Sequence, residues 1–392
     1  MDARKMTDQV SLLGFVDWDA RLFDSLIPLP DGTSYNAYLI KGSEKTVLID
    51  SVEQEFGSEL LAQLGDNLKL DYIVSLHAEQ DHSGAIPVLL AKYPKAKLVT
   101  NPKGKELLMD LLEIDETRFM TVQDGEILSL GDKTLEFIYT PWVHWPETMS
   151  LYLKEDKILF SCDFFGSHIA TTDVYVTDEG RVYEAAKRYY AEIMMPFRAI
   201  IVKNIEKLLT REIAMIAPSH GPVFQNPDFI IDAYKDWISS PPQNKVVIPF
   251  ISMHGSTKLM VDYLVKSLVN KGVSVVQYNL AITDIGKLAI DLVDAGTIVV
   301  GTPTVLAGPH PIAAYGTLLA NALKPKAKFI SIIGSYSWGG KTVEMLASMI
   351  PNLKVEVLTP VIAKGLPREK DYAALEQLAT DIANKHKELG FK

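Results

Sequence analysis

The sequence is poor in cysteine, because Cys162 is the one thiol among 392 residues. No intramolecular disulfide can form, and the chain cannot supply the four thiolates that an iron–sulfur cluster requires. Any redox chemistry must therefore use a cofactor that cysteines do not hold.

Long apolar runs and an excess of basic residues are also missing. The longest apolar runs, such as residues 86–91, fall far short of the ~20 residues that span a bilayer. The segment Met1–Val10 lacks the apolar core of a secretory signal. Asp and Glu (49) outnumber Lys and Arg (39), and a formal net charge of −10 argues against binding to nucleic acid or anionic lipid. We therefore expect a cytoplasmic protein with no nucleic-acid or membrane partner.

The composition that remains is that of a globular protein with more than one domain. Hydrophobic residues make up 47% of the chain, and its length suits two or three domains at roughly 150 residues each. The clearest interruption is the Ser/Pro-rich stretch Ser239–Asn244, where two consecutive prolines cannot continue a helix. We predict one domain over residues 1–243 and a second over residues 244–392.

The second domain alternates between apolar runs and amphipathic stretches. Strands are predicted at Val246–Ile251, Val273–Tyr278, Thr297–Val300, Lys328–Ile333 and Val355–Thr359. Helices are predicted between and after them, at Thr257–Asn270, Thr283–Asp294, Pro311–Ala322, Lys341–Met349 and Glu369–Lys387. This alternation indicates an α/β fold with a doubly wound parallel sheet, whose ligands bind at the carboxyl ends of the strands. His386 falls on a polar helix, and we expect it to be solvated.

The first domain mixes short strands, hairpin-like turns and helices, which suggests a layered α/β arrangement. Strands are predicted at Ser34–Ile40, Lys45–Asp50, Tyr72–Ser75, Leu98–Thr100, Glu126–Leu130, Thr134–Tyr139, Ser150–Leu153 and Ile158–Ser161. Helices are predicted at Glu55–Leu64, Lys105–Leu111, Val182–Glu192 and Pro227–Ile238.

Histidines and carboxylates gather after several of these strands. Four potential ligands, His77, Glu79, Asp81 and His82, fall within six residues after the strand that begins at Tyr72. His144, Asp163 and His220 each follow another strand-like run, and loops at strand ends are where functional groups concentrate. Four imidazoles and three carboxylates suffice for two metal ions that share a carboxylate, roughly 3.5–4 Å apart. His168 could instead orient a ligand or contact a bound substrate.

Three loops of the second domain have the composition of a phosphate and ring-binding site. The loop before its first helix combines hydroxyl groups, a glycine and backbone N–H groups at a helix N-terminus, which favours an anion. Two further loops emerge at the same sheet edge, with glycine and aromatic residues that suit a flat ring. The candidate residues are Ser252, Met253, His254, Gly255, Ser256, Thr257, Thr302, Pro303, Thr304, Gly308, Ser335, Tyr336, Trp338 and Gly339. The dinucleotide fingerprint Gly-x-Gly-x-x-Gly is absent after the first strand, which disfavours NAD or FAD there.

The histidine and carboxylate pattern resembles the metallo-β-lactamase superfamily and, more narrowly, the flavodiiron proteins. The hydrolases of that superfamily normally carry His where this chain has Glu79. Further segments that resemble the flavodiiron family are Thr33–Tyr38, His144–Pro146, Ser161–Asp163, Phe165–His168 and Ala217–Gly221. The resemblance covers essentially the full chain. It implies an N-terminal metallo-β-lactamase-like αββα sandwich followed by a flavodoxin-like domain that binds FMN.

The resemblance also implies a ligand set and an activity. His77, Glu79 and His144 would hold one iron, Asp81, His82 and His220 the other, and Asp163 would bridge them. In some relatives the residue at the position of His82 turns away and water takes its place, so both arrangements stay open. Reduced FMN would pass electrons to this non-haem diiron site, which reduces O2 to water or NO to N2O, a detoxification suited to an anaerobe or microaerophile. His168 is the candidate catalytic residue, and Trp145, Phe164 and Phe165 would exclude bulk water. Cys162 stands where relatives often carry Asn, beside the bridging residue.

Partners and alternatives follow from the same comparison. The family pairs chains head to tail, which implies a homodimer or a dimer of dimers. The electron donor would be a separate rubredoxin-like protein, reduced coenzyme F420 or an NADH-linked reductase. Two other hypotheses stay open: a zinc-dependent hydrolase, and an electron-transfer module whose FMN works while its diiron site is vestigial.

Overall fold

The described N-terminal part of the chain contains two large sheets and the small hairpin of β3 (Leu22–Phe23) and β4 (Ile27–Pro28). The computed structural model describes residues 2–239 and 241–391. The first sheet has the strand order β1-β2-β5-β6-β7-β8-β9. Its strands are β1 (Arg4–Lys5), β2 (Val10–Asp17), β5 (Thr33–Lys41), β6 (Thr46–Ile49), β7 (Tyr72–Val74), β8 (Lys97–Thr100) and β9 (Phe119–Thr121). The second sheet consists of β10 (Ile127–Ser129), β11 (Thr134–Tyr139), β12 (Met149–Leu153), β13 (Ile158–Cys162) and β14 (Met215–Pro218).

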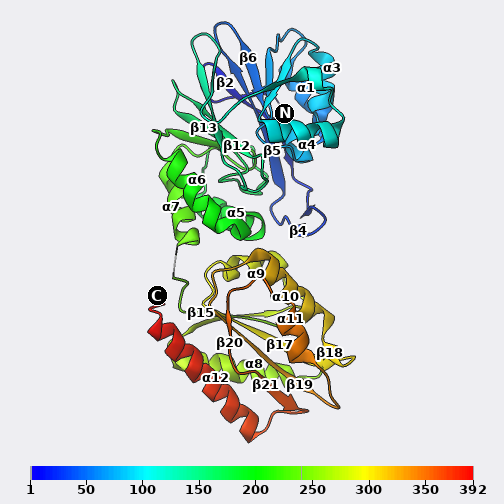
Figure 1. Cartoon of the computed structure of the whole chain (residues 1–392), viewed down its shortest axis with the longest axis vertical. Coiled ribbons are helices and arrows are strands. Elements are labelled where there is room, and N and C mark those ends of the chain that lie inside the picture. The colour runs from blue at the N-terminus through cyan, green and yellow to red at the C-terminus, as the bar shows by residue number, and fades with distance from the viewer. Residues whose placement is uncertain (1, 240, 392) are drawn as a thin grey trace. The chain divides into compact units, whose positions relative to one another are not determined.

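The first sheet buries side chains on both of its faces, because successive side chains along a strand point to opposite faces. In β5, Tyr38 and Ile40 belong to the core between the sheets, together with Phe137 and Phe160 of the second sheet. Ala37 and Leu39 point the other way and pack with the helices of the opposite face. The helices of this region are α1 (Gly57–Leu64), α2 (Gln80–Ser83), α3 (Ile86–Lys92), α4 (Pro102–Leu112), α5 (Glu179–Tyr189), α6 (Arg198–Leu208) and α7 (Pro227–Ile238). Helix α6 lies against the second sheet, since Lys207 donates a hydrogen bond to the carbonyl of Tyr139. The expected αββα arrangement is confirmed (Figure 1).

The C-terminal part contains one mainly parallel sheet with the order β16-β15-β17-β19-β20. In chain order this is 2-1-3-4-5, the flavodoxin-like order, so the predicted doubly wound sheet is confirmed. The strands are β15 (Lys245–Phe250), β16 (Ser274–Asn279), β17 (Thr297–Val305), β18 (Gly308–Pro309), β19 (Phe329–Tyr336), β20 (Glu356–Val357) and β21 (Val361–Lys364). The helices are α8 (Ser256–Asn270), α9 (Ile285–Leu292), α10 (Pro311–Leu323), α11 (Thr342–Ser348) and α12 (Glu369–Glu388).

The chain divides into two compact units, Met1–Tyr190 with Phe197–Ile238, and Ala191–Pro196 with Ser239–Lys392. The division falls a few residues before the predicted boundary, and the short segment 191–196 groups with the second unit. The domain limits 1–243 and 244–392 therefore stay predictions. No helix in the described ranges is both long and apolar enough to cross a membrane.

One expectation about the second unit is wrong, and another is only partly right. His386 is not solvated: it is buried, with its ring nitrogens 2.6 Å from Thr297 Oγ1 and 2.9 Å from Asn244 Oδ1. The strand predicted at Val355–Thr359 is present but shorter, as β20, and a further strand that was not predicted, β21, follows Pro360. Proline has no N–H to donate to a sheet, which explains the break.

Candidate metal centre and cofactor pocket

The histidines and carboxylates singled out in the first unit come together where strands of both sheets end. His77 and Glu79 follow β7, and Asp81 and His82 lie in the short helix α2. His144 follows β11, Asp163 comes directly after β13, and His220 comes two residues after β14. Segments far apart in the sequence thus meet because a common core fixes the strand ends.

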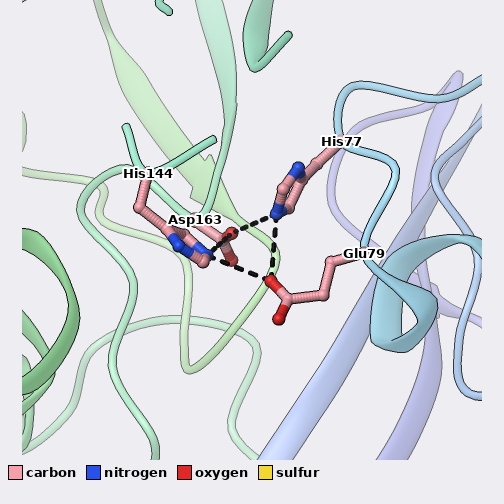
Figure 2. Close-up of side chains that lie close together, drawn as sticks. All are labelled: His77, Glu79, His144 and Asp163. Atoms are coloured by element: carbon pink, nitrogen blue, oxygen red, sulfur yellow. Dashed lines mark hydrogen bonds and ion pairs between the residues drawn. The ribbon is translucent and has the colours of Figure 1, made fainter. Parts of the chain in front are cut away.

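Four of these residues form the first group, which consists of His77, Glu79, His144 and Asp163 (Figure 2). Glu79 Oε2 lies 3.0 Å from Nε2 of His77 and 3.0 Å from Nε2 of His144. Asp163 Oδ2 lies 3.5 and 3.4 Å from the same two nitrogens. The four side chains therefore point their ligand atoms at one small volume.

The second group consists of Asp81, His82 and His220. Asp81 Oδ2 lies 3.2 Å from Nε2 of His82 and 3.1 Å from Nε2 of His220. The other oxygen of Asp163, Oδ1, lies 2.9 Å from His82 Nε2 and 3.4 Å from His220 Nε2. Asp163 thus contributes one carboxylate oxygen to each group, which is the arrangement that a bridging ligand needs.

These donors fit a pair of cations. Both oxygens of Asp81 and Oδ2 of Asp163 are buried and accept no hydrogen bond within the described ranges. Buried carboxylates are costly unless a charge or metal compensates them. Imidazole nitrogen and carboxylate oxygen together suit iron, whereas zinc sites are richer in nitrogen and sulfur.

The pKa values of the site residues, in the protein without a metal, show that the site attracts positive charge. Burial opposes charging of His82, but Asp81 and Asp163 raise its pKa to about 10. Burial likewise opposes charging of His144, but Asp163 and Glu79 raise its pKa to about 9. Although burial disfavours the anion, the surrounding histidines hold the pKa of Asp163 well below its usual range. In the absence of a metal, protons on the histidines therefore supply the positive charge.

The outer nitrogens of the clustered histidines contact residues that the sequence did not single out. Glu147 Oε1 lies 2.6 Å from His77 Nδ1, and the backbone N–H of Ala78 donates to the same oxygen at 3.0 Å. His220 Nδ1 donates to the carbonyl of Ser34 at 2.7 Å. In the sequence, Glu147 is marked only by its place three residues after His144. Its contact with His77 depends on the fold and cannot be seen in the sequence.

Cys162 is buried next to the bridging residue, and burial raises the pKa of its thiol well above the ordinary value. The Cys162 side chain therefore stays a neutral thiol. Its sulfur nevertheless lies within 4.8 Å of ligand atoms of His82 and Asp163.

His168 lies beside the two groups without joining either. Its ring centroid is 4.7 Å from that of His220, and its Nδ1 lies 2.9 Å from Thr33 Oγ1. Burial lowers the pKa of His168 well below the usual value, and its Nε2 is buried without a hydrogen-bond partner among the described residues. The imidazole is therefore neutral, with one nitrogen open to a further polar group.

Aromatic rings border the site on several sides. The Trp145 ring packs edge-on at 4.9 Å from His77. Phe23, in the hairpin formed by β3 (Leu22–Phe23) and β4 (Ile27–Pro28), lies 5.1 Å from His168, and sequence reasoning missed it. Phe164 and Phe165 are buried and stack on each other at 4.1 Å, next to Tyr234.

The loops predicted to bind a flat cofactor line a cavity of 280 Å³ in the second unit. Its lining includes Ser252, Met253, His254, Ser256, Thr257, Pro303, Thr304, Ser335 and Tyr336 from the predicted set, together with Ser337 and Gly365. Gly255 caps α8 beside this cavity, and Gly339 lines a neighbouring pocket with Tyr336. Thr302 is buried and accepts a hydrogen bond from the His310 N–H, and Gly308 lies in β18. The loop after β21, which carries Gly365, also lines the cavity, and the sequence did not indicate this.

The end of this cavity at α8 fits a phosphate group. Thr257 Oγ1 is buried at the first turn of α8 and has no hydrogen-bond partner in the described part of the chain. Gly255, with φ of 93°, precedes the helix and lets the backbone turn there. Helix N-termini bind anions through free N–H groups and the helix dipole. Trp338, 78% exposed in the loop after β19, offers an aromatic surface for a ring system.

Known proteins are similar to this chain over both of its units. Residues 33–221 match the family model described as "ODP family beta lactamase". The chain is 34% identical to rubredoxin-oxygen oxidoreductase of Megalodesulfovibrio gigas over 98% of both chains. It is also 34% identical to the nitric oxide reductase of Moorella thermoacetica, over 96% of this chain and 97% of that one.

Solved structures cover both units as well. Rubredoxin oxygen:oxidoreductase from Desulfovibrio gigas superposes with a TM-score of 0.94 at 32% identity, over 98% of this chain and 99% of that one. The flavodiiron protein from Giardia intestinalis superposes with a TM-score of 0.90 at 28% identity, over 98% of this chain and 97% of that one.

Proposed function

The chain belongs to the flavodiiron protein family, and from this premise we propose that it is an FMN-dependent diiron oxidoreductase that reduces O2, NO or both. The observation that carries the proposal is the position of Asp163, which directs one carboxylate oxygen into each of two groups of buried ligands. Bound FMN would supply electrons, and paired iron would supply the redox centre at which O2 becomes water or NO becomes N2O.

The proposed ligand set uses every histidine and carboxylate of the two groups. His77, Glu79 and His144 would hold the first iron, Asp81, His82 and His220 the second, and Asp163 would bridge them. The short distances from His82 Nε2 to Asp81 and Asp163 support a ligand role for His82 rather than a ring turned away.

FMN would bind in the second unit, along the cavity between α8 and the loops after β17 and β19. The unpartnered hydroxyl of Thr257 and the N–H groups at the start of α8 would hold the phosphate. The aromatic side chains of Tyr336 and Trp338 would border the ring.

Residues around the metal centre orient the ligands and keep water away. Phe23 and Trp145 present apolar rings to His168 and His77 and so limit the entry of bulk water. His168 is proposed as the catalytic residue, because its neutral ring leaves Nε2 available for a hydrogen bond to a reactant. If the Thr33 hydroxyl donates to Nδ1, the proton of His168 is on Nε2, which makes that nitrogen a donor.

The partners belong to the same proposal. The names of two similar proteins support rubredoxin as electron donor, and reduced F420 or an NADH-linked reductase are the alternatives. A homodimer or dimer of dimers stays a prediction that the molar mass in solution will test, and the cytoplasmic location also stays a prediction.

Anaerobic turnover of the iron- and FMN-loaded protein tests the function. The protein is supplied with reduced candidate donors, and loss of O2 and of NO is followed on separate electrodes. The proposal predicts donor-dependent loss of at least one gas, and that loss should disappear in D163N. A colourless protein that carries zinc and hydrolyses an ester or lactam would contradict it.

A further inference from the structure

The outer nitrogen of His77 is held by a carboxylate. Glu147 is buried, and its Oε1 lies 2.6 Å from His77 Nδ1 while it accepts the Ala78 N–H at 3.0 Å. A proton on Nδ1 leaves the lone pair of Nε2 free, and Nε2 faces Glu79 and Asp163. The contact with Glu147 thus fixes both the direction of the ring and the tautomer that can bind a metal.

Glu147 is itself held by the fold, independently of any metal. Its backbone carbonyl accepts a hydrogen bond from the side chain of Asn101. Asn101 also caps α4, since its Oδ1 accepts the Gly104 N–H at 2.7 Å. Two residues after Glu147, the Met149 N–H donates to the carbonyl of Leu76, directly before His77. The segments that carry Glu147 and His77 are therefore fixed side by side.

The second group of ligands has no equivalent of Glu147. His220 Nδ1 donates to the neutral carbonyl of Ser34, and His82 Nδ1 is buried with no hydrogen-bond partner within the described ranges. A carboxylate partner makes a ligand imidazole more basic than a carbonyl partner does, and it adds negative charge next to the ion. The two positions differ in this outer contact even though each has a carboxylate of its own and a share of Asp163.

We propose that Glu147 is a positioning residue that makes the two metal positions unequal, so that the position of His77, Glu79 and His144 binds its ion more tightly and fills first. Glu147 acts through His77 and does not touch the ion. This inference rests on the metal centre proposed above, but it adds an order of loading that the ligand set alone does not give.

Variants at Glu147 are expected to fold. The Asn101 contact uses the backbone carbonyl of residue 147, which every substitution keeps. Glu147 also lines a pocket of 230 Å³ with polar neighbours such as Lys103 and Gln123, so water can reach the space that a shorter side chain leaves. E147Q keeps the volume and an acceptor for His77 but removes the charge, whereas E147A removes both.

The test is an anaerobic titration of the metal-free, full-length protein with Fe²⁺, followed by calorimetry. Wild type should show two unequal binding events. Loss of an outer partner of a ligand histidine typically lowers metal affinity 10–100-fold. We expect E147A to lower the Fe²⁺ affinity of the tighter binding event by about that factor, and E147Q to lower it less. E53Q is the matched control, because Glu53 is a half-buried carboxylate whose charge interacts with Asp81 and, more weakly, with Glu79, and its side chain makes no hydrogen bond to His77. It should change the tighter event far less than E147A does.

A second variant assigns the events. D81N should weaken the looser event, whereas E147A weakens the tighter one, because Asp81 and Glu147 contact histidines of different ligand groups. If wild type binds no pair of ions, the proposed function itself is wrong. If wild type binds two ions but folded E147A keeps the tighter event intact or loses only the looser one, the role of Glu147 is refuted while the metal centre stands.

Discussion

Glu79 places a carboxylate among the histidines of the proposed metal centre. Its carboxylate lies 3.0 Å from both His77 and His144, in the middle of the first group. Hard oxygen donors shift a mixed site away from zinc and towards iron. The identity of one side chain can therefore decide which metal the centre takes up.

E79H should reverse that preference. An imidazole at this position adds a nitrogen donor and removes a negative charge, so the ratio of zinc to iron bound from an equimolar mixture should rise several-fold. Elemental analysis after loading measures the ratio. E79Q is the control for loss of charge alone, and an E79H variant that still selects iron as wild type does would contradict this role.

Proton release should accompany metal binding. In the metal-free protein, burial opposes the charged forms, but the neighbouring carboxylates raise the pKa of His82 to about 10 and of His144 to about 9. Both rings are therefore protonated at pH 7, whereas a metal binds only neutral imidazole. Apparent affinity should rise with pH up to about 9–10 and then level off.

Calorimetric titration in buffers of different ionisation enthalpy measures these protons. At pH 7 the observed heat should depend on the buffer, and the dependence should fade above pH 10. A heat that is the same in all buffers at pH 7 would show that the histidines were already neutral.

The sequence could single out the clustered histidines and carboxylates because they share two simple signals. One is the dense run His77–His82, and the other is that His144, Asp163 and His220 each follow a strand. Glu147 and Phe23 could not be found in this way, because their contacts join segments that only tertiary packing brings together. His386 was misjudged for the same reason: its own helix is polar, but Thr297 and Asn244 on other segments bury it.

Among the elements, α8 has the clearest link to a ligand. Its first turn carries Thr257, whose buried hydroxyl has no partner within the described ranges, and Ser252 Oγ accepts the Gly255 and Lys258 N–H groups next to it. A buried hydroxyl without a hydrogen-bond partner lowers the stability of the folded protein. A bound phosphate would accept a hydrogen bond from it and so restore that stability.

T257V should weaken FMN binding roughly 10- to 100-fold, because a hydrogen bond to a charged group contributes about 1.5–3 kcal/mol. The FMN-free variant should be as stable as wild type or slightly more so, since a buried unsatisfied hydroxyl is removed. Quenching of flavin fluorescence measures the affinity. T380V is the control, because Thr380 in α12 bonds its own helix at Glu376. Unchanged FMN affinity in T257V would place the phosphate elsewhere.

Strands and helices were predicted best where hydrophobic patterning is regular. The alternation in the second unit predicted α8 to α12 to within a few residues, and the predicted ranges of β11 and α7 match the structure. The strand β2 and the helices α3 and α6 were not predicted. In β2 the adjacent residues Leu12 and Leu13 are buried in the cores on opposite faces of the sheet, so this strand lacks the polar alternation that marks a half-exposed strand.

Over the full chain, each unit carries its own site. The proposed metal ligands belong to Met1–Tyr190 and Phe197–Ile238, whereas the cavity proposed for FMN is lined by residues of Ser239–Lys392. A ligand stabilises the folded unit that binds it by mass action. Metal and FMN should therefore act on separate parts of the unfolding transition.

Differential scanning calorimetry should resolve this difference. A ligand at 100 times its Kd adds about 2.7 kcal/mol, which raises the Tm of a unit of this size by roughly 5–10 °C. FMN should shift one transition and Fe²⁺ the other. A single transition that both ligands shift equally would mean that the units unfold as one.

The claim on which the account depends is that Asp163 joins two iron ions into one centre. Electron paramagnetic resonance of the iron-loaded, half-reduced protein tests it most directly. The geometry predicts the spectrum of a magnetically coupled, mixed-valent pair in wild type, replaced in D163N by signals of isolated ferric ions or by loss of iron. If wild type itself gives only isolated ferric ions, Asp163 does not bridge and the account fails.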